Sequence, residues 1–343
     1  MNIELLANLT GFEKNDLEEA IEGKKLLGLG LELTRRCNLN CVYCYANSGK
    51  PLNNELKFYE IIKIIDEAIL LGVKKIGIIG GGEPLLYNRL KELINYLFQN
   101  GMRISLFTNG VLLNQEWASF LYSKSVSIVQ KLNSFNEKIQ DELCSKKDTF
   151  KSIQSSINNL RRAGYPSKES KLSIETVILK ENIEELPTLW RWARNNQITP
   201  IFEQLTPFGR GENIANCCST EEIKKLFILL SKIDFEEFSI EWTPRPPFAG
   251  KRGCYHHYYA LYITSTGDIQ PCSGVTIKLG NIRENRIKNI LNSKVITELR
   301  HVGDLVEGRC KNCLHGQCCY GCRGSAFQML GNYLASDPQC WYS

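Results

Sequence analysis

Long hydrophobic runs are missing from this sequence of 343 residues. The most apolar windows, such as Ile61–Leu71, are interrupted by charged side chains such as Lys63 and Asp66. None approaches the roughly 20 apolar residues that a membrane-spanning helix needs. The first residues also lack the basic region followed by an apolar stretch that is typical of a signal peptide. The sequence therefore predicts a cytoplasmic protein with no membrane partner.

A strong excess of charge of one sign is missing too. The chain has 42 Lys and Arg against 37 Asp and Glu, a formal net charge of +5, and no arginine-rich tract. This balance predicts no nucleic-acid partner. Histidine is scarce, and we expect its four copies to be core or solvated side chains. They are His256, His257, His301 and His315.

Cysteine, by contrast, is abundant, with fourteen copies. Three lie within Cys37–Cys44 and five within Cys310–Cys322. Disulfides are disfavoured in a reducing compartment, and disulfide scaffolds are usually much shorter than this chain. The grouping therefore predicts metal binding or redox chemistry. Cys144, Cys217 and Cys218 lie outside the groups and are expected to be ordinary thiols.

Short β-like runs alternate with amphipathic stretches from Leu26 onward. This alternation predicts an α/β fold with a parallel sheet and right-handed crossovers. Six such units are too few for a closed eight-fold barrel, so we expect a partial (β/α)6 TIM-like barrel. The expected strands are Leu27–Leu33, Lys75–Ile79, Arg103–Phe107, Val126–Leu132, Leu172–Leu179 and Pro200–Gln204. The expected helices are Leu56–Leu71, Tyr87–Gln99, Asn114–Ser123, Thr149–Ala163, Ile183–Asn195, Ser219–Lys232 and Ile287–Leu299.

Four regions are expected along the chain. They are an N-terminal helical segment (1–25), the partial barrel (26–215), a helix and linker (216–249) and a small cysteine-rich domain (250–343). The stretch Trp242–Gly250, rich in proline and glycine, indicates the linker. A small segment crowded with cysteines cannot build much apolar core and would need metal to hold its shape.

The first cysteine group is Cys37, Cys41 and Cys44, in a loop just after an expected strand. Cysteine thiolates are the usual ligands of iron–sulfur clusters, and a [4Fe–4S] cube has four irons. Three ligands would leave one iron open, as in catalytic metal sites that keep a position for substrate. The alternative is a structural zinc site, which would need a fourth ligand.

The C-x3-C-x2-C spacing, with an aromatic residue before the last cysteine, resembles the signature of the radical S-adenosylmethionine (SAM) superfamily. The resemblance implies that SAM chelates the open iron of the cluster. It also implies that an electron from the reduced cluster cleaves SAM to a 5′-deoxyadenosyl radical, which abstracts a hydrogen atom from the substrate.

Three later elements resemble parts of the same superfamily: Gly80-Gly-Gly-Glu-Pro84, Thr108-Asn-Gly110 and Pro207-Phe-Gly-Arg-Gly211. Glycines let the backbone approach a ligand, and a guanidinium suits a carboxylate, although a tight turn and a solvated arginine are the simpler alternatives. One departure is Lys131-Leu-Asn133, where many members have Ser-x-Asp. The resemblance implies these SAM-binding residues: Gly81, Gly82, Glu83, Pro84, Thr108, Asn109 and Arg210.

The second cysteine set resembles the SPASM extension, which holds two auxiliary [4Fe–4S] clusters. The resemblance implies Cys254, Cys272 and Cys322 on one cluster, and Cys310, Cys313, Cys318 and Cys340 on the other. Two features depart from the family. Four residues, not the usual five, separate Cys313 from Cys318, so the adjoining Cys319 is an alternative ligand, and the first auxiliary cluster has three clear ligands. A zinc ribbon is the structural alternative.

The resemblance implies reductive SAM cleavage but leaves the substrate open. We expect modification of a peptide or protein, by oxidation, cross-linking or epimerisation. The alternatives are a tetrapyrrole of an anaerobic haem pathway or a carbohydrate-like small molecule. A flavodoxin- or ferredoxin-like protein is the expected electron donor. A different class of function, a non-catalytic iron–sulfur electron carrier, would need only the auxiliary clusters. No catalytic residue is assigned.

Overall fold

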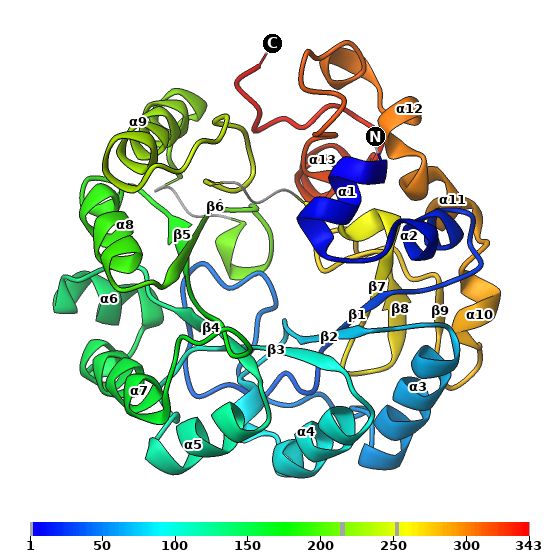
Figure 1. Ribbon diagram of the computed structural model, residues 1–343, viewed down its shortest axis with the longest axis horizontal. Helices are drawn as coiled ribbons and strands as arrows, with labels where there is room; N and C mark the ends of the chain where they lie inside the picture. The colour runs from blue at the N-terminus through cyan, green and yellow to red at the C-terminus, as the bar shows by residue number, and fades with distance from the viewer. Residues whose placement is uncertain (1–2, 213–216, 251–253, 343) are drawn as a thin grey trace.

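The computed structural model describes residues 3–212, 217–250 and 254–342. Its centre is a curved sheet with the strand order β6-β5-β4-β3-β2-β1-β7-β8-β9, and helices surround the sheet on its outer side (Figure 1). Strands β1 to β7 pair in parallel, whereas β8 and β9 run antiparallel to their neighbours. The strands are β1 (Gly28–Leu31), β2 (Lys75–Ile78), β3 (Arg103–Thr108), β4 (Ser127–Lys131), β5 (Leu172–Ile178), β6 (Thr199–Gln204), β7 (Ala260–Ile263), β8 (Asp268–Gln270) and β9 (Gly280–Asn281).

The helices between the parallel strands bury one face against the sheet. In α4, for example, Leu90, Leu93, Ile94 and Leu97 are buried at spacings of three and four. The helices are α1 (Ile3–Thr10), α2 (Lys14–Ile21), α3 (Phe58–Leu70), α4 (Leu90–Gln99), α5 (Gln115–Ser123), α6 (Glu137–Cys144), α7 (Thr149–Ala163), α8 (Leu186–Asn195), α9 (Thr220–Phe238), α10 (Ile287–Ile290), α11 (Lys294–Arg300), α12 (Val302–Leu305) and α13 (Arg323–Leu330).

The expected strands and helices of the barrel lie where the periodicity placed them, with ends shifted by a few residues. This confirms an open, partial α/β barrel. Two details were wrong. Helix α6, which has only eight residues, was not expected, and the helix expected over Ile287–Leu299 is divided into α10 and α11.

The C-terminal region joins the barrel sheet through β7. Strand β7 pairs in parallel with β1, from Gly28 opposite Ala260 to Leu31 opposite Ile263. The division expected at residue 250 therefore separates segments that share one sheet. The boundary expected between residues 215 and 216 lies outside the described residues, as do residues 1, 2 and 343.

The segment expected as a linker lies against β6. Backbone hydrogen bonds join Gln204 N to the Pro247 carbonyl at 3.1 Å and Ala249 N to the Phe202 carbonyl at 2.9 Å. Trp242 is buried, and its indole N–H donates to Asp234 at 2.8 Å. An edge strand presents unpaired backbone N–H and C=O groups. The segment therefore pairs some of these groups and covers the edge of β6.

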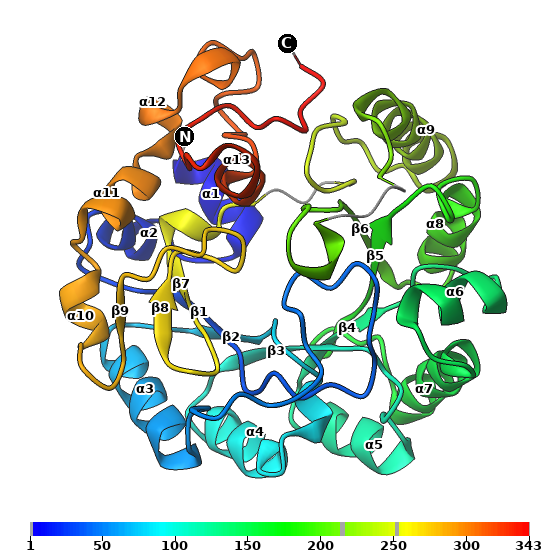
Figure 2. The same ribbon diagram turned by 180° about the vertical axis from the view of Figure 1, so that it is seen from behind.

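The N-terminal helices pack against the C-terminal region, far away in sequence. Leu6 of α1 and Leu17 of α2 share a buried cluster with Tyr258, Val302 and Tyr320. Figure 2 shows α2 beside α11. None of the described helices is both long and apolar enough to cross a bilayer.

Candidate active site

A cavity of about 350 Å³ lies at the carboxyl ends of the parallel strands, where parallel barrels place their chemistry. Its walls come from the loop after β1 and from the ends of β2 to β6. All three cysteines of the first group line this cavity. So do all the expected SAM-binding residues except Pro84, which is buried beside Glu83.

The loop that carries the three cysteines is held by backbone contacts. Cys37 N donates to the Gly49 carbonyl at 3.0 Å, and Cys44 N donates to the Cys41 carbonyl at 3.2 Å. The unexpected helix α6 supports the same loop, since the Leu143 carbonyl accepts from Val42 N at 3.0 Å. Burial raises the pKa of the Cys37 thiol to about 11. Metal binding there would therefore release a proton.

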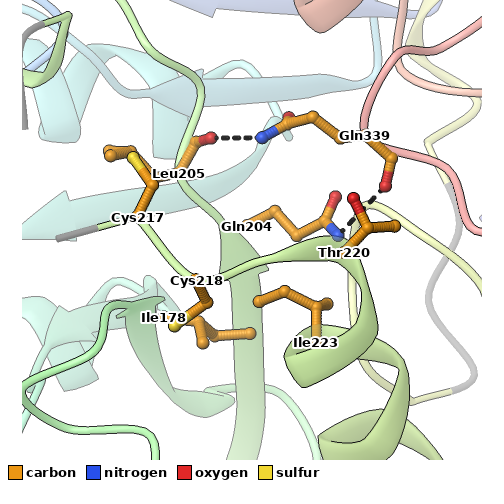
Figure 3. A pocket seen from close by; sticks show the side chains of 8 residues that line it. All are labelled: Ile178, Gln204, Leu205, Cys217, Cys218, Thr220, Ile223 and Gln339. Atoms are coloured by element: carbon orange, nitrogen blue, oxygen red, sulfur yellow. Dashed lines mark hydrogen bonds between the residues drawn. The ribbon is translucent and has the colours of Figure 1, made fainter. Parts of the chain in front are cut away.

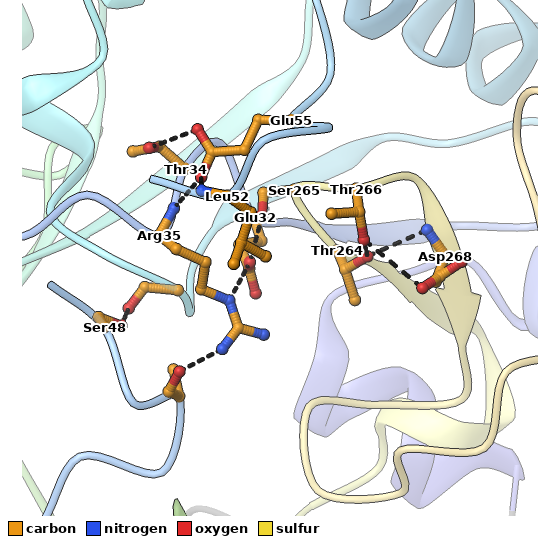
Figure 4. A network of polar contacts seen from close by, with 12 residues as sticks. Glu32, Thr34, Arg35, Ser48, Leu52, Glu55, Thr264, Ser265, Thr266 and Asp268 are labelled. Carbon is orange, nitrogen blue, oxygen red and sulfur yellow. Dashed lines mark hydrogen bonds and ion pairs between the residues drawn. The ribbon is translucent and has the colours of Figure 1, made fainter. Parts of the chain in front are cut away.

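A buried carboxylate, Glu32, ties this loop to the C-terminal region (Figure 4). It accepts hydrogen bonds from Arg35 Nε at 2.5 Å, from Ser265 Oγ at 2.6 Å and from Tyr262 OH at 2.9 Å. Glu55 adds a second anchor by accepting from Arg35 N at 2.6 Å. The contacts of Glu32 with Tyr262 and Ser265 join residues more than 200 positions apart, so no local pattern in the sequence indicates them.

The glycine-rich stretch after β2 packs directly on the cysteine loop. Gly82 N donates to the Thr34 carbonyl at 2.6 Å, and Glu83 N donates to the Arg36 carbonyl at 2.9 Å. A Cβ atom on Gly82 would lie 1.9 Å from the Arg36 carbonyl oxygen. Glycine is therefore required here by a close backbone approach.

Glu83 joins the loops after β2 and β3. Its carboxylate accepts from Thr108 Oγ1 at 2.7 Å, from Asn109 N at 2.8 Å and from Leu85 N at 3.1 Å. Burial raises the pKa of Glu83 above its ordinary value, and these donors oppose the rise. With these three partners, the carboxylate holds the two loops together at the cavity wall.

Asn109 and Arg210 reach the cysteine loop from opposite sides. Asn109 Nδ2 donates to Asn38 Oδ1 at 2.9 Å and lies 3.9 Å from Cys37 Sγ. Arg210 donates through Nε to the Cys41 carbonyl and through Nη1 to the Ser48 carbonyl, both at 2.8 Å. The Arg210 guanidinium is thus partly engaged by the protein and is not a freely solvated surface arginine.

Strands β4, β5 and β6 each place one charged side chain at the cavity wall. Lys131 Nζ lies 3.0 Å from Glu175 and 3.6 Å from Glu203. Burial alone would lower the pKa of Lys131, but the two carboxylates outweigh it and keep the pKa above its ordinary value. Lys131 stands where the sequence departs from the Ser-x-Asp pair of many family members.

In the C-terminal region, Cys254, Cys272 and Cys322 lie near one another. Burial raises the pKa of Cys272 to about 12, and the neighbouring thiols of Cys254 and Cys322 add to the rise. Cys272 Sγ accepts from Val275 N at 3.2 Å, and Cys322 Sγ accepts from Ser325 N at 3.4 Å. Backbone donors of this kind suit thiolate ligands of an iron–sulfur cluster.

The C-terminal tail, which carries Cys340, is fastened to β6. Gln339 Nε2 donates to the Leu205 carbonyl at 2.8 Å, beside a small pocket of about 40 Å³ (Figure 3). Cys217 and Cys218 line this pocket, outside both cysteine groups. None of the fourteen cysteines forms a disulfide. Among the described residues, no three ligand side chains are gathered at the spacing of a single bound metal ion.

Comparison with known proteins identifies two family domains. The radical SAM superfamily matches residues 31–193, and the SPASM iron–sulfur cluster-binding domain matches residues 254–314. The crystal structure of Streptococcus suis SuiB bound to its precursor peptide SuiA has a similar fold, with a TM-score of 0.72 and 18% identity. The match covers 96% of this chain and 79% of that chain.

Similar sequences include two Methanosarcina barkeri proteins. An AdoMet-dependent heme synthase is 29% identical over 338 residues, which covers 91% of this chain and 95% of that protein. An Fe-coproporphyrin III synthase is 31% identical, with coverages of 90% and 86%. The mycofactocin maturase MftC of Mycolicibacterium smegmatis is 28% identical, with coverages of 90% and 81%. The chain therefore belongs to the radical SAM superfamily, and it is an enzyme with a SPASM domain whose cofactors are SAM, a [4Fe–4S] cluster and auxiliary iron–sulfur clusters.

Proposed function

We propose that Cys37, Cys41 and Cys44 hold the SAM-cleaving cluster and that SAM lies beside Gly81 and Gly82. Three thiols on one cavity wall and a glycine stretch with no room for a side chain support this assignment. The cluster, when bound, supplies the electron that cleaves SAM to a 5′-deoxyadenosyl radical. A flavodoxin- or ferredoxin-like protein is the proposed source of that electron.

The protein residues around SAM divide into two kinds. We propose that backbone carbonyls of the stretch from Gly80 to Gly82 accept from the SAM ammonium, because the Glu83 carboxylate already accepts three hydrogen bonds. Among the described residues no hydrogen bond uses Arg210 Nη2, which we propose for the SAM carboxylate, while Nε and Nη1 hold the cysteine loop.

For the second auxiliary cluster we propose Cys310, Cys313, Cys319 and Cys340 as ligands, in place of the expected Cys318. Cys319 Sγ accepts from Gly321 N at 3.3 Å, as Cys313 Sγ accepts from His315 N and Cys310 Sγ from Asp337 N, each at 3.5 Å. Burial raises the pKa of Cys340 to about 12, and the neighbouring Cys310 and Cys319 contribute to it.

Cys318 has different surroundings. Its thiol lies 2.8 Å from Arg245 Nη1 and 3.5 Å from the His315 carbonyl oxygen, and it has no backbone N–H donor among the described residues. The choice of Cys319 also makes the spacing from Cys313 five residues, the more usual one in the family.

The adjoining cysteines provide a matched pair of variants. Cys319→Ala is expected to lose about four irons after anaerobic reconstitution, because one [4Fe–4S] cube loses a ligand. Cys318→Ala is expected to keep the wild-type iron content. Iron and sulfide analysis, with electron paramagnetic resonance (EPR) spectra of the reduced proteins, would check this. The opposite pattern would assign the ligand to Cys318.

We further propose that the substrate is a peptide or protein, oxidised by hydrogen abstraction as in a maturase. The observation that carries this is the charge of the cavity wall. Its cations are Lys131 and Arg210, and its carboxylates are Glu83, Glu175 and Glu203. Lys131 is already paired with two carboxylates, so the wall favours a neutral or cationic group over an anion. The similarity to a mycofactocin maturase agrees with this proposal.

A tetrapyrrole is the second candidate. It is favoured by similarity over 90% or more of this chain to a heme synthase and to an Fe-coproporphyrin III synthase. Aromatic side chains of the cavity wall, Phe107, Phe208 and Phe248, could pack on a flat macrocycle. A tetrapyrrole with several carboxylates would, however, find few free cationic partners there.

Isotope transfer would distinguish the candidates. Reduced enzyme and SAM would be incubated with a deuterated mixture of peptides or, separately, with deuterated Fe-coproporphyrin III. Deuterium in 5′-deoxyadenosine is expected only with the peptides, accompanied by peptides that have lost two hydrogens. Transfer only from the tetrapyrrole would replace the peptide proposal with the second candidate. The control is Cys217→Ala, which lies outside both cysteine groups and should behave as wild type.

A further inference from the structure

Arg323 is a buried cation whose hydrogen-bonding capacity is only partly used. It follows Cys322 at the start of α13, and 1% of its surface is exposed. Nη1 donates to the Tyr333 carbonyl at 2.9 Å and to the Ala335 carbonyl at 2.6 Å. Nε and Nη2 are buried and have no hydrogen-bond partner among the described residues. Buried donors of a charged group are strongly unfavourable when they remain unpaired.

No carboxylate of the described residues is in direct ion-pair contact with Arg323. The nearest candidate is the buried carboxylate of Asp337, which influences Arg323 only at a distance. Asp337 is instead engaged by two backbone donors, Cys322 N at 2.8 Å and Gln339 N at 3.0 Å. Asp337 attracts the guanidinium but accepts none of its hydrogen bonds, so acceptors for Nε and Nη2 are missing from this place.

The position of the unpaired nitrogens indicates which group is missing. A Cβ atom built on Gly321 would lie 2.8 Å from Arg323 Nη2 and 3.4 Å from Cys310 Sγ. The nearest atom to the same position is Asp337 Cβ at 2.7 Å, so the Asp337 side chain, the guanidinium and a thiol of the second auxiliary site border one point beside Gly321. The φ of Gly321 is +69°, and its N–H donates to Cys319 Sγ, so this glycine also turns the chain around the same site.

We propose that Nε and Nη2 of Arg323 donate hydrogen bonds to sulfur atoms of the auxiliary cluster held by Cys310, Cys313, Cys319 and Cys340. Arg323 would then be a positioning residue that stabilises the reduced cluster, because reduction adds a negative charge beside a buried cation. Hydrogen bonds to the sulfurs and local charge set the reduction potential of such clusters. This inference depends on the proposed assignment of the second auxiliary cluster.

The test is a redox titration of the auxiliary clusters. It would use full-length protein in which Cys37, Cys41 and Cys44 are replaced by alanine, so that only auxiliary clusters give EPR signals. Arg323→Gln is expected to move the midpoint potential of one cluster to more negative values and to leave the other unchanged. Arg323→Lys, which keeps the charge, is expected to recover most of the shift.

Arg300→Gln is the matched control. Arg300 is a buried arginine of α11 whose Nη1 donates to the Leu291 carbonyl at 2.6 Å, so it has a comparable structural role away from the cysteines. Its variant should leave both potentials unchanged. Unchanged potentials in Arg323→Gln with full iron content would overturn the proposal, and Arg323 would then only hold the C-terminal tail.

A measurement on the unaltered protein covers the case in which Arg323→Gln does not fold. Protein made with arginine carrying ¹⁵N in its guanidino group would be reduced and studied by pulsed EPR. A nitrogen coupling to one auxiliary cluster supports the proposal, and its absence overturns it. A wild-type protein that assembles only about four irons in total would instead overturn the cluster assignment, which distinguishes failure of the proposed function from failure of this inference.

Discussion

Replacement of Cys37, Cys41 and Cys44 by alanine is expected to abolish formation of 5′-deoxyadenosine from SAM. These are the three thiols that meet in the main cavity. Their loss removes the ligands of one [4Fe–4S] cube, so iron content after anaerobic reconstitution should fall from about twelve to about eight per chain. Chromatographic detection of deoxyadenosine with SAM and dithionite, together with iron and sulfide analysis, would measure both effects.

The control for this prediction is Cys217→Ala. Cys217 lines a separate small pocket and belongs to neither cysteine group, so its replacement should leave iron and SAM cleavage at wild-type values. Zinc in place of iron, or deoxyadenosine formation by the triple variant, would contradict the assignment of these cysteines. Loss of about four irons from the triple variant with intact SAM cleavage would also contradict this assignment.

Gly82→Ala is expected to lower SAM cleavage by about 100-fold or more. The added Cβ would lie 1.9 Å from the Arg36 carbonyl oxygen, next to the first cluster ligand, so the cysteine loop must move. A displacement of about 1 Å in a catalytic arrangement can cost about 100-fold in rate. Deoxyadenosine formation under saturating SAM, with iron content measured on the same samples, would check the prediction.

Gly49→Ala is the matched control in the same loop. Gly49 exchanges backbone hydrogen bonds with Arg35 and Cys37, but no atom lies within 4 Å of the position of an added Cβ. Alanine keeps these bonds, so iron content and SAM cleavage should remain near wild type. Equal activity of the Gly82 and Gly49 variants would show that the close contact at Gly82 does not position the cysteine loop.

Short-range patterns predicted much of the barrel. Apolar spacings of three and four placed α3, α4, α5 and α7, and alternating burial placed β3, because these signals repeat within a few residues. The cysteine group from Cys37 to Cys44 was recognisable for the same reason, since its three ligands lie within eight residues. The glycine stretch at Gly80–82 was recognisable as well, but the contact that requires Gly82 was not.

Spacing was insufficient where function depends on residues that only the fold brings together. Lys131, Glu175 and Glu203 stand on three different strands, and their ion pairs depend on the register of β4, β5 and β6. Glu83 was expected to bind SAM, and only the structure shows that its carboxylate also joins two loops. In each case, the pairing of strands decides which side chains become neighbours. A pattern within a few residues carries no information about that pairing.

The same limit explains the C-terminal region. The sequence by itself determined that this region is rich in candidate metal ligands, because eight cysteines fall within Cys254–Cys340, and the resemblance of their pattern to the SPASM extension implied iron–sulfur clusters. Only the tertiary structure decided that β7 extends the barrel sheet, that Cys319 lies near Cys310 and Cys340, and that Arg323 is buried with two guanidinium nitrogens unpaired among the described residues. These features depend on which side chains share a buried space, and burial is a property of the whole packed chain.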